Sequence, residues 1–170
     1  LLTLSKRMRS PSGAPGPGLG RLATSPRAMV CPSEATERWC LANAGPPPLT
    51  VVTRDVGAAD ALRAAGLELS PARAAGRPIP GAFRVAGHAG PVPSLPGFEA
   101  GHLWVQDASS ALVADLVGAG EGTRALDACA APGGKTFRMA SRGAHVTAVD
   151  ASEHRLARVA EGARRLGLAP

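Results

Sequence analysis

The clearest pattern of hydrophobic and polar positions lies in the last part of the chain, residues 101–170. Two short apolar runs, 124–129 and 145–149, predict β-strands, and a glycine-rich turn with a helix over about 134–141 separates them. After the second run, apolar residues recur at helical spacing behind Ser152, a residue type that caps helix N-termini. Strand, helix, strand and helix at this spacing predict a right-handed βαβ unit.

The segments around this unit are also predicted. The run 145–149 is mostly apolar on both faces, which is typical of an interior parallel strand covered on both sides, and 124–129 is predicted to be a short buried strand. Residues 103–106 are a further strand candidate, followed by a helix that Asp107 can cap. Its apolar positions at helical spacing are Leu112, Val113, Leu116 and Val117. The fold class is therefore α/β with a parallel, Rossmann-like sheet, of which we expect only the first two strands.

Weaker signals precede this region and predict a small second α/β subdomain over residues 34–100. The elements expected there are helices at 34–42 and 58–65, strands at 49–53 and 82–86, and a loop over 87–101. Residues 1–33 are rich in Pro, Gly, Ser and Arg and have no periodicity, so we expect a disordered linker or a tail foreign to the fold.

The charge of the chain adds little. The net charge is +6, but residues 1–33 hold five basic and no acidic side chains, while the remainder carries 14 basic and 13 acidic groups. Charge alone therefore does not indicate nucleic acid binding.

The three cysteines, Cys31, Cys40 and Cys129, form no CxxC pair, which argues against a disulfide framework or a zinc site and favours a reducing, cytoplasmic compartment. No apolar run approaches the about 20 residues of a membrane span. We therefore expect neither a metal nor a membrane partner.

Candidate chemistry gathers where the first strand of the βαβ unit ends. The sequence from Asp127 to Thr136 is Asp-Ala-Cys-Ala-Ala-Pro-Gly-Gly-Lys-Thr, and its small residues let a ligand approach the backbone closely. Asp150 ends the neighbouring strand. Ligands of open α/β sheets bind at the carboxyl ends of the strands, and an acid at the second strand hydrogen-bonds ribose hydroxyls. The pattern predicts a site for an adenosine-containing ligand.

Three ligand motifs compete for this turn. The dinucleotide motif G-x-G-x-x-G is not met. The P-loop motif matches at its end, Gly134 to Thr136, but its first glycine falls on Cys129, so the phosphate cradle is incomplete. The class I methyltransferase pattern acid-x-(Gly/Cys)-x-(Gly/Ala)-x-Gly is filled by Asp127, Cys129, Ala131 and Gly133 and fits best. A P-loop-like nucleotide-binding protein stays open as the alternative.

The stretch from Asp127 to Thr136 resembles the cofactor motif of the Sun-type (Nol/Nop/Sun) RNA cytosine-5 methyltransferases. Val105 to Ser110 resembles the segment that precedes this motif, and Leu95 to Phe98, Arg38-Trp39 and Pro47 to Thr50 are similar to upstream landmarks. The resemblance implies a class I fold, S-adenosyl-L-methionine as methyl donor, and a cytosine in RNA, usually ribosomal RNA, as acceptor. It also implies that residues 34–100 form an RNA-recognition-like subdomain and that residues 101–170 begin the methyltransferase domain.

Carried over by position, the resemblance implies that the turn after the first strand contacts the cofactor. It also implies that Asp150 binds the ribose and that Arg155, on the following helix, lines the site. The residues implied in the turn are Cys129, Ala130, Ala131, Pro132, Gly133, Gly134 and Lys135. Asp127 is either an oriented turn acid or a ligand.

Family members methylate through a cysteine thiolate that attacks C6 of the base, and a second cysteine helps to release the product. The motifs that carry these two cysteines have no counterpart here, so we expect the catalytic residues beyond residue 170 and an inactive fragment. Cys129 is expected to fill space against the cofactor. We expect the protein to be monomeric and cytoplasmic and to bind RNA. A non-catalytic RNA-binding piece is a further hypothesis.

With two strands of the parallel sheet present, the apolar faces of 124–129 and 145–149 lack neighbours. We predict that the isolated 170-residue chain is poorly stable and prone to aggregation. Thermal unfolding followed by circular dichroism should then show no sharp transition. A cooperative, reversible transition would contradict this prediction.

Overall fold

The computed structural model describes residues 2–4, 34–45 and 47–168. Residues 1–8 and 48–170 form one unit and residues 9–47 a second, and each is described by itself. In the second unit, helix α1 (Glu34–Asn43) agrees with the helix predicted over 34–42. Glu34 and Glu37 in its first turn favour this start, because negative charge stabilises helix N-termini.

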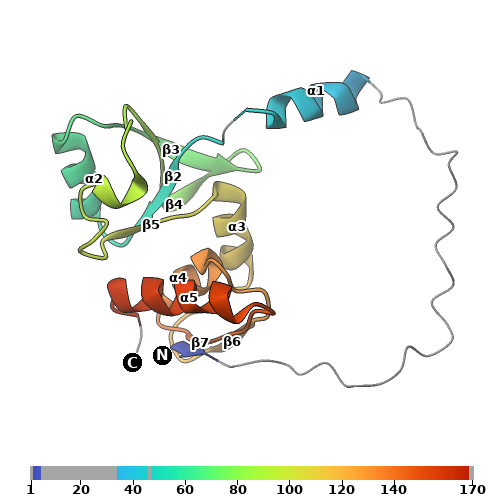
Figure 1. The fold of residues 1–170 in the computed structure, drawn as a ribbon, viewed down its shortest axis with the longest axis vertical. Coiled ribbons are helices and arrows are strands. Elements are labelled where there is room, and N and C mark those ends of the chain that lie inside the picture. Colours follow the sequence, from blue (N-terminus) through green and yellow to red (C-terminus); the bar gives the residue numbers. More distant parts are fainter. Residues whose placement is uncertain (1, 5–33, 46, 169–170) are drawn as a thin grey trace, which may run out of the picture. The chain divides into compact units, whose positions relative to one another are not determined.

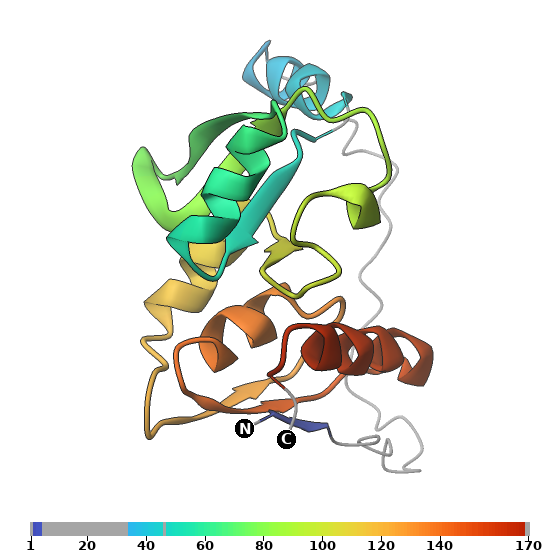
Figure 2. The ribbon, with the colours of Figure 1, turned by 90° about the vertical axis from the view of Figure 1, so that its left-hand side faces the viewer.

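The larger unit contains the predicted parallel sheet. Its strands β1 (Leu2–Leu4), β7 (His145–Ala148) and β6 (Arg124–Asp127) lie in the order β1-β7-β6, with β7 parallel to both neighbours (Figure 1). Helices α4 (Gly134–Ala140) and α5 (Glu153–Arg165) lie on the same face of this sheet (Figure 2). The βαβ order and the strand and helix positions of the sequence prediction are confirmed over residues 124–165.

Strand β1 corrects the prediction that the N-terminal residues lie outside the fold. Leu2 pairs with Val146 and is only 4% exposed, so this segment belongs to the sheet and its core. Three residues are too short to show periodicity in the sequence. The pairing depends on the free edge of β7, a partner that lies far away along the chain. Residues 5–33 of the predicted tail lie outside the described residues.

A second sheet of four antiparallel strands precedes the parallel one. Its order is β3 (Glu68–Ala74), β4 (Arg77–Ala86), β2 (Thr50–Thr53) and β5 (Leu103–Val105). Three of these strands match predicted segments, although β4 starts earlier than the predicted 82–86. Strand β3 was not predicted, because it contains Pro71 and no β-branched residue. It lies at the sheet edge, where proline is tolerated, and its register shifts between Pro71 and Arg73.

Both faces of the antiparallel sheet are covered. Helix α2 (Val56–Ala64) and the loop that contains the 3₁₀ turn η1 (Val92–Ser94) cover one face. The residues buried there are Val51, Leu62, Val85, Leu95 and Leu103. On the other face, Val52, Ala82 and Trp104 join the main core, together with helix α3 (Ala108–Leu116) and α4. All four residues of β2 are buried as a result.

Two predictions of burial are wrong. Asp107 caps α3 as expected, but the helix buries Ala108, Ala111 and Ala114, while Leu116 is 77% exposed. Alanines let α3 pack closely against α4 and the antiparallel sheet. Leu112 packs partly buried against the same core, as predicted, whereas Val113 and Leu116 are exposed. Strand β6 is not buried either, since Leu126 is 62% exposed. Within the described part of the chain β6 is the edge strand, and hydrophobic patterning alone does not distinguish edge from interior strands.

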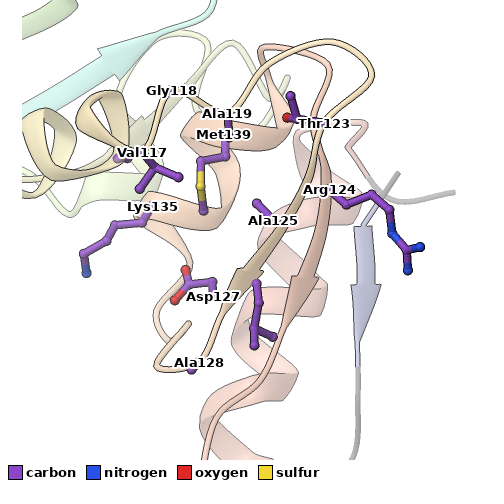
Figure 3. A pocket seen from close by; sticks show the side chains of 12 residues that line it. Val117, Gly118, Ala119, Thr123, Arg124, Ala125, Asp127, Ala128, Lys135 and Met139 are labelled. Carbon is purple, nitrogen blue, oxygen red and sulfur yellow. The ribbon is translucent and has the colours of Figure 1, made fainter.

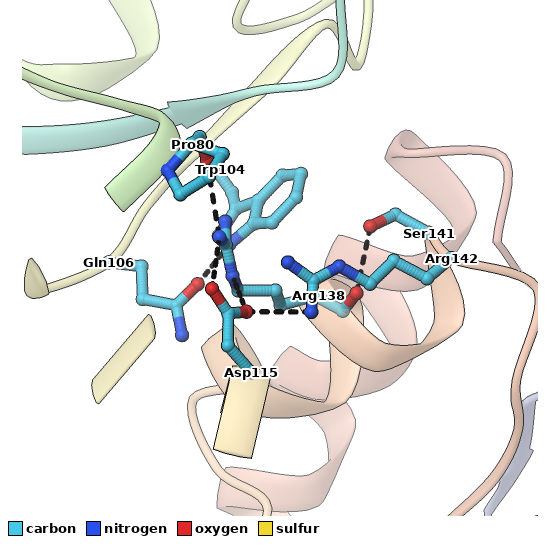
Figure 4. Close-up of polar contacts among 7 residues, drawn as sticks. All are labelled: Pro80, Trp104, Gln106, Asp115, Arg138, Ser141 and Arg142. Carbon is cyan, nitrogen blue, oxygen red and sulfur yellow. Dashed lines mark hydrogen bonds and ion pairs between the residues drawn. The ribbon is translucent and has the colours of Figure 1, made fainter. Parts of the chain in front are cut away.

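A buried arginine joins α4 to α3 and to the antiparallel sheet (Figure 4). Arg138 is 4% exposed, and its Nε and Nη2 donate to the Asp115 carboxylate at 2.5 and 2.8 Å. Nη2 also donates to the Pro80 carbonyl of β4 at 3.1 Å, and Arg142 adds a second ion pair to Asp115 at 2.8 Å. Burial raises the pKa of Asp115, but the hydrogen bonds and charges of Arg138 and Arg142 outweigh it, and the pKa is lowered.

Among the helices that the structure describes, none is long and apolar enough to cross a membrane.

We predict that Asp115→Asn lowers the free energy of unfolding near neutral pH by about 1.5–3 kcal/mol, because it weakens hydrogen bonds to two charged groups. The carboxyl pKa is lower in the folded state, so this stabilisation is present above the unfolded pKa of about 3.9 and is lost as pH falls through the folded pKa. Denaturant unfolding between pH 3 and pH 7, in the longest soluble protein that contains residues 1–170, should show the stabilities of the unchanged protein and the variant converging at low pH. Asp60→Asn, which breaks an exposed pair with Arg63, is the control and should cost about 0–1 kcal/mol. An equal loss for both variants would contradict the prediction.

Candidate functional site

The candidate site is built around the turn that joins β6 to α4, residues 128–133. Asp127, at the end of β6, holds both sides of this turn. Its Oδ1 accepts a hydrogen bond from the backbone N–H of Cys129 at 3.3 Å, and its Oδ2 accepts one from the Thr136 hydroxyl at 2.7 Å. Asp127 is 9% exposed and Thr136 is fully buried. Of the two roles left open for Asp127, its contacts are those of an oriented turn acid.

The end of β7 supports the turn from the other side. The Ala130 N–H donates to the Val149 carbonyl at 3.0 Å, and the Ala131 N–H donates to Oδ2 of Asp150 at 3.1 Å. The other carboxylate oxygen of Asp150 accepts from the Ser152 N–H at 3.0 Å. The two strand ends are therefore joined by hydrogen bonds, and Asp150 lies beside the turn as the sequence pattern predicts.

Asp150 is held in its ionised form. The hydrogen bond from the Ser152 N–H lowers the pKa of the Asp150 carboxyl, burial opposes this, and the Ala131 N–H and the positive charge of Arg155 add to the lowering. Arg155 starts from α5 and donates from Nη2 to the Ala131 carbonyl at 3.0 Å; the same atom lies 3.7 Å from Asp150 Oδ2. Arg155 thus contacts the turn, and about half of its side chain is exposed.

The predicted site residues divide by exposure. Cys129, Pro132 and Arg155 are exposed, and Gly134 and Lys135 are half-buried. The buried members are Ala130, Ala131, Gly133 and Asp150. The backbone N–H groups of residues 129–131 already donate within the protein. Those of residues 133–135 have no acceptor in the described part of the chain, as geometry requires at the start of a helix. Backbone donors for a ligand therefore remain at residues 133–135.

Aromatic packing fixes the second half of the turn. Gly133 has a φ of +116°, which L side chains rarely adopt, and a Cβ there would also collide with the Phe137 ring. The same end of this ring also lies against Gly162 of α5, where an added Cβ would be 2.6 Å from Cζ. The edge-to-face contact with Trp104 has a centroid distance of 6.4 Å. Sequence reasoning missed Gly162, since a glycine inside a helix carries no signal of its neighbours.

A cavity of about 420 Å³ lies beside the turn, along the open edge of β6 (Figure 3). Val117 and Met139 contribute apolar walls, and Asp127, Ala128 and Lys135 line the end near the turn. Asp150 does not line this cavity. In the described part of the chain, no group of three or more His, Cys, Asp and Glu residues could hold a metal ion.

The P-loop alternative fits the geometry poorly. A P-loop needs its Ser or Thr hydroxyl free to contact Mg²⁺. Here the Thr136 hydroxyl is fully buried and donates to Asp127, so it is committed to holding the turn.

The turn lies within a segment that is similar to known proteins. Residues 115–170 match the family described as 16S rRNA methyltransferase RsmB/F. Ribosomal RNA small subunit methyltransferase B from Yersinia enterocolitica is 51% identical over 79 residues, which are 45% of this chain and 18% of the relative. The protein of that name from Yersinia pseudotuberculosis is 53% identical over 76 residues, 44% of this chain and 18% of the relative. The chain thus spans about a fifth of the length of these relatives.

A solved structure, the methyltransferase homologue from Pyrococcus horikoshii, matches 80% of this chain and 46% of its own with 26% identity and a TM-score of 0.66. These findings confirm the resemblance to the Sun-type family and the Rossmann-like fold class.

We predict that Thr136→Val lowers the free energy of unfolding by about 1–3 kcal/mol, because it removes the hydroxyl donor and leaves a buried Asp127 oxygen unpaired. Thr136→Ser keeps the hydroxyl and is the matched control. Denaturant unfolding of the three chains measures the difference. If the valine variant is as stable as the unchanged protein, the hydrogen bond to Asp127 contributes nothing to stability, and the prediction is wrong.

Proposed function

We propose that this chain, whose residues 115–170 match the family of 16S rRNA methyltransferases RsmB/F, forms the start of the cofactor-binding domain of an S-adenosylmethionine-dependent enzyme that methylates ribosomal RNA. The observation that carries the proposal is the turn after β6, braced by Asp127 and Asp150 within the matched segment. This arrangement places small residues and free backbone donors at the carboxyl ends of two parallel strands, where ligands of this fold class bind.

The cofactor is proposed to lie across the turn. S-adenosylmethionine supplies an electrophilic methyl group on a positively charged sulfur. Asp150, ionised and next to Ala131, would accept hydrogen bonds from the ribose hydroxyls with the lone pairs that its two backbone contacts leave free. The N–H groups of residues 133–135 would donate to the ligand, and Arg155 would hold the Ala131 side of the turn in place.

The remaining residues of the predicted set have supporting roles in this proposal. Ala130 and Ala131 keep the turn narrow, and Pro132 and the exposed side chain of Cys129 form its outer surface. Lys135 also lines the neighbouring cavity, so we assign it to the surface beside the cofactor.

The finer part of the proposal concerns the acceptor atom. The resemblance implies transfer to C5 of a cytosine through a cysteine thiolate. Cys129 does not suit this role, because it lies in the turn that would hold the cofactor, with its N–H bound to Asp127. Cys40 lies on α1, in the other unit. We therefore propose that residues other than these two supply the thiolate.

The test is calorimetric titration of S-adenosylhomocysteine and, separately, Mg-ATP into the longest soluble protein that contains residues 1–170. We predict binding of S-adenosylhomocysteine and none of Mg-ATP. Asp150→Ala should weaken the binding about 10- to 100-fold, the value of a hydrogen bond to a charged group.

Asp150 also braces the turn, so the control must separate affinity from folding. Leu62→Ala, in the separate core between α2 and the antiparallel sheet, is expected to destabilise the protein away from the turn and should leave the affinity unchanged. Binding of Mg-ATP alone would overturn the methyltransferase proposal in favour of a nucleotide-binding protein. Equal loss of affinity in both variants would remove Asp150 from the site.

A further inference from the structure

Gln106 lies in the protein interior, next to the candidate cofactor turn. It follows β5 directly and is 4% exposed. Its Oε1 accepts a hydrogen bond from the indole Nε1 of Trp104 at 2.9 Å, which holds the carboxamide in one orientation (Figure 4). The carboxamide lies against Gly134, the first residue of α4, so the antiparallel sheet contacts the turn through this side chain.

Glycine is required at positions 133 and 134 for different reasons. Gly133 has a left-handed backbone, whereas the φ of Gly134 lies outside the range that L residues avoid. A Cβ at Gly134 would instead meet Gln106, at 3.1 Å from Cγ, 3.2 Å from Cδ and 3.4 Å from Nε2. These are its three nearest neighbours outside the adjoining chain, and contacts this short force one partner to move. The obstacle to a side chain at 134 is therefore Gln106.

The amide nitrogen of Gln106 is a second, independent sign. Nε2 is buried and has no hydrogen-bond partner among the described residues. A buried donor without an acceptor lowers stability, and such groups are rare in folded proteins. The bond from Trp104 accounts for the carboxamide oxygen, because an apolar side chain here would leave the indole N–H unpaired, but it does not account for the unpaired nitrogen. A polar group kept despite such a cost is typical of sites where position matters for function.

We propose that Gln106 is a positioning residue for the cofactor turn. It supports the Gly134 backbone from inside the protein and thereby fixes the N–H groups of residues 133–135 that face the ligand. The inference rests on the proposed function, because it assigns Gln106 to the same cofactor site. On this proposal, position 134 is a glycine because a larger residue would collide with Gln106, and not because the ligand must approach the backbone closely. The Gln106 contact also links the turn to β5, so the position of the antiparallel sheet sets the position of the turn.

A double-mutant cycle tests this proposal. S-adenosylhomocysteine affinity is measured by calorimetry for the unchanged protein, Gly134→Ala, Gln106→Ala and the double variant, in the longest soluble protein that contains residues 1–170. Gln106→Ala removes the three atoms that a Cβ at 134 would meet. We expect Gly134→Ala to weaken binding at least tenfold, and the double variant to bind within about threefold of Gln106→Ala alone. Gly133→Ala, which is strained by its own φ and by Phe137, is the matched control and should not be rescued by Gln106→Ala.

The outcomes separate the two proposals. If Gly134→Ala is equally harmful with and without Gln106, the glycine serves the ligand, and the positioning role is overturned. Thermal midpoints of the same proteins separate affinity from stability: a purely structural contact lowers the midpoint and leaves the affinity of the folded protein unchanged, which also overturns the role. If the unchanged protein does not bind S-adenosylhomocysteine, the proposed function fails, and the positioning role fails with it.

Discussion

The shape of the candidate site depends on two buried carboxylates that accept hydrogen bonds from one turn. Asp127 binds the start of the turn and the first helical residues after it, and Asp150 binds its middle from the neighbouring strand. Buried N–H groups must be paired, and in this turn the acids pair them without bulky side chains. The outer surface of the turn stays open as a result. Arg155 completes the arrangement from α5, so four consecutive elements of the βαβ unit meet at this point.

The antiparallel sheet is a structural part of this site. Arg138 connects α4 to β4, and Gln106 and Trp104 extend from β5 to the turn and to Phe137. Both faces of the sheet are covered, one by α2 and the other by α3 and α4. Among the described residues, neither face of this sheet is therefore left open for RNA.

Several features of the fold were predictable because their causes are local. Asp107 and Ser152 cap their helices through hydrogen bonds to residues two or three positions ahead, and Gly133 must be small for its own backbone. The short segments 124–129 and 145–149 indicated β6 and β7. The exposure of Leu126 and Leu116 was not predictable, since it depends on which strand is at the edge and on which helix face packs through alanines.

The sequence by itself determined the order of elements, the turn with its two acids, and the family resemblance, because each is written in neighbouring residues or in a fixed spacing. The tertiary structure decided the partners of those residues. The hydrogen bond from Ala131 to Asp150 spans 19 positions, and the ion pair from Arg138 to Asp115 spans 23. The pairing of Leu2 with Val146 and the packing of Gln106 beneath Gly134 likewise join separate elements. Such contacts form only when whole elements pack together, and no local pattern in the chain encodes them.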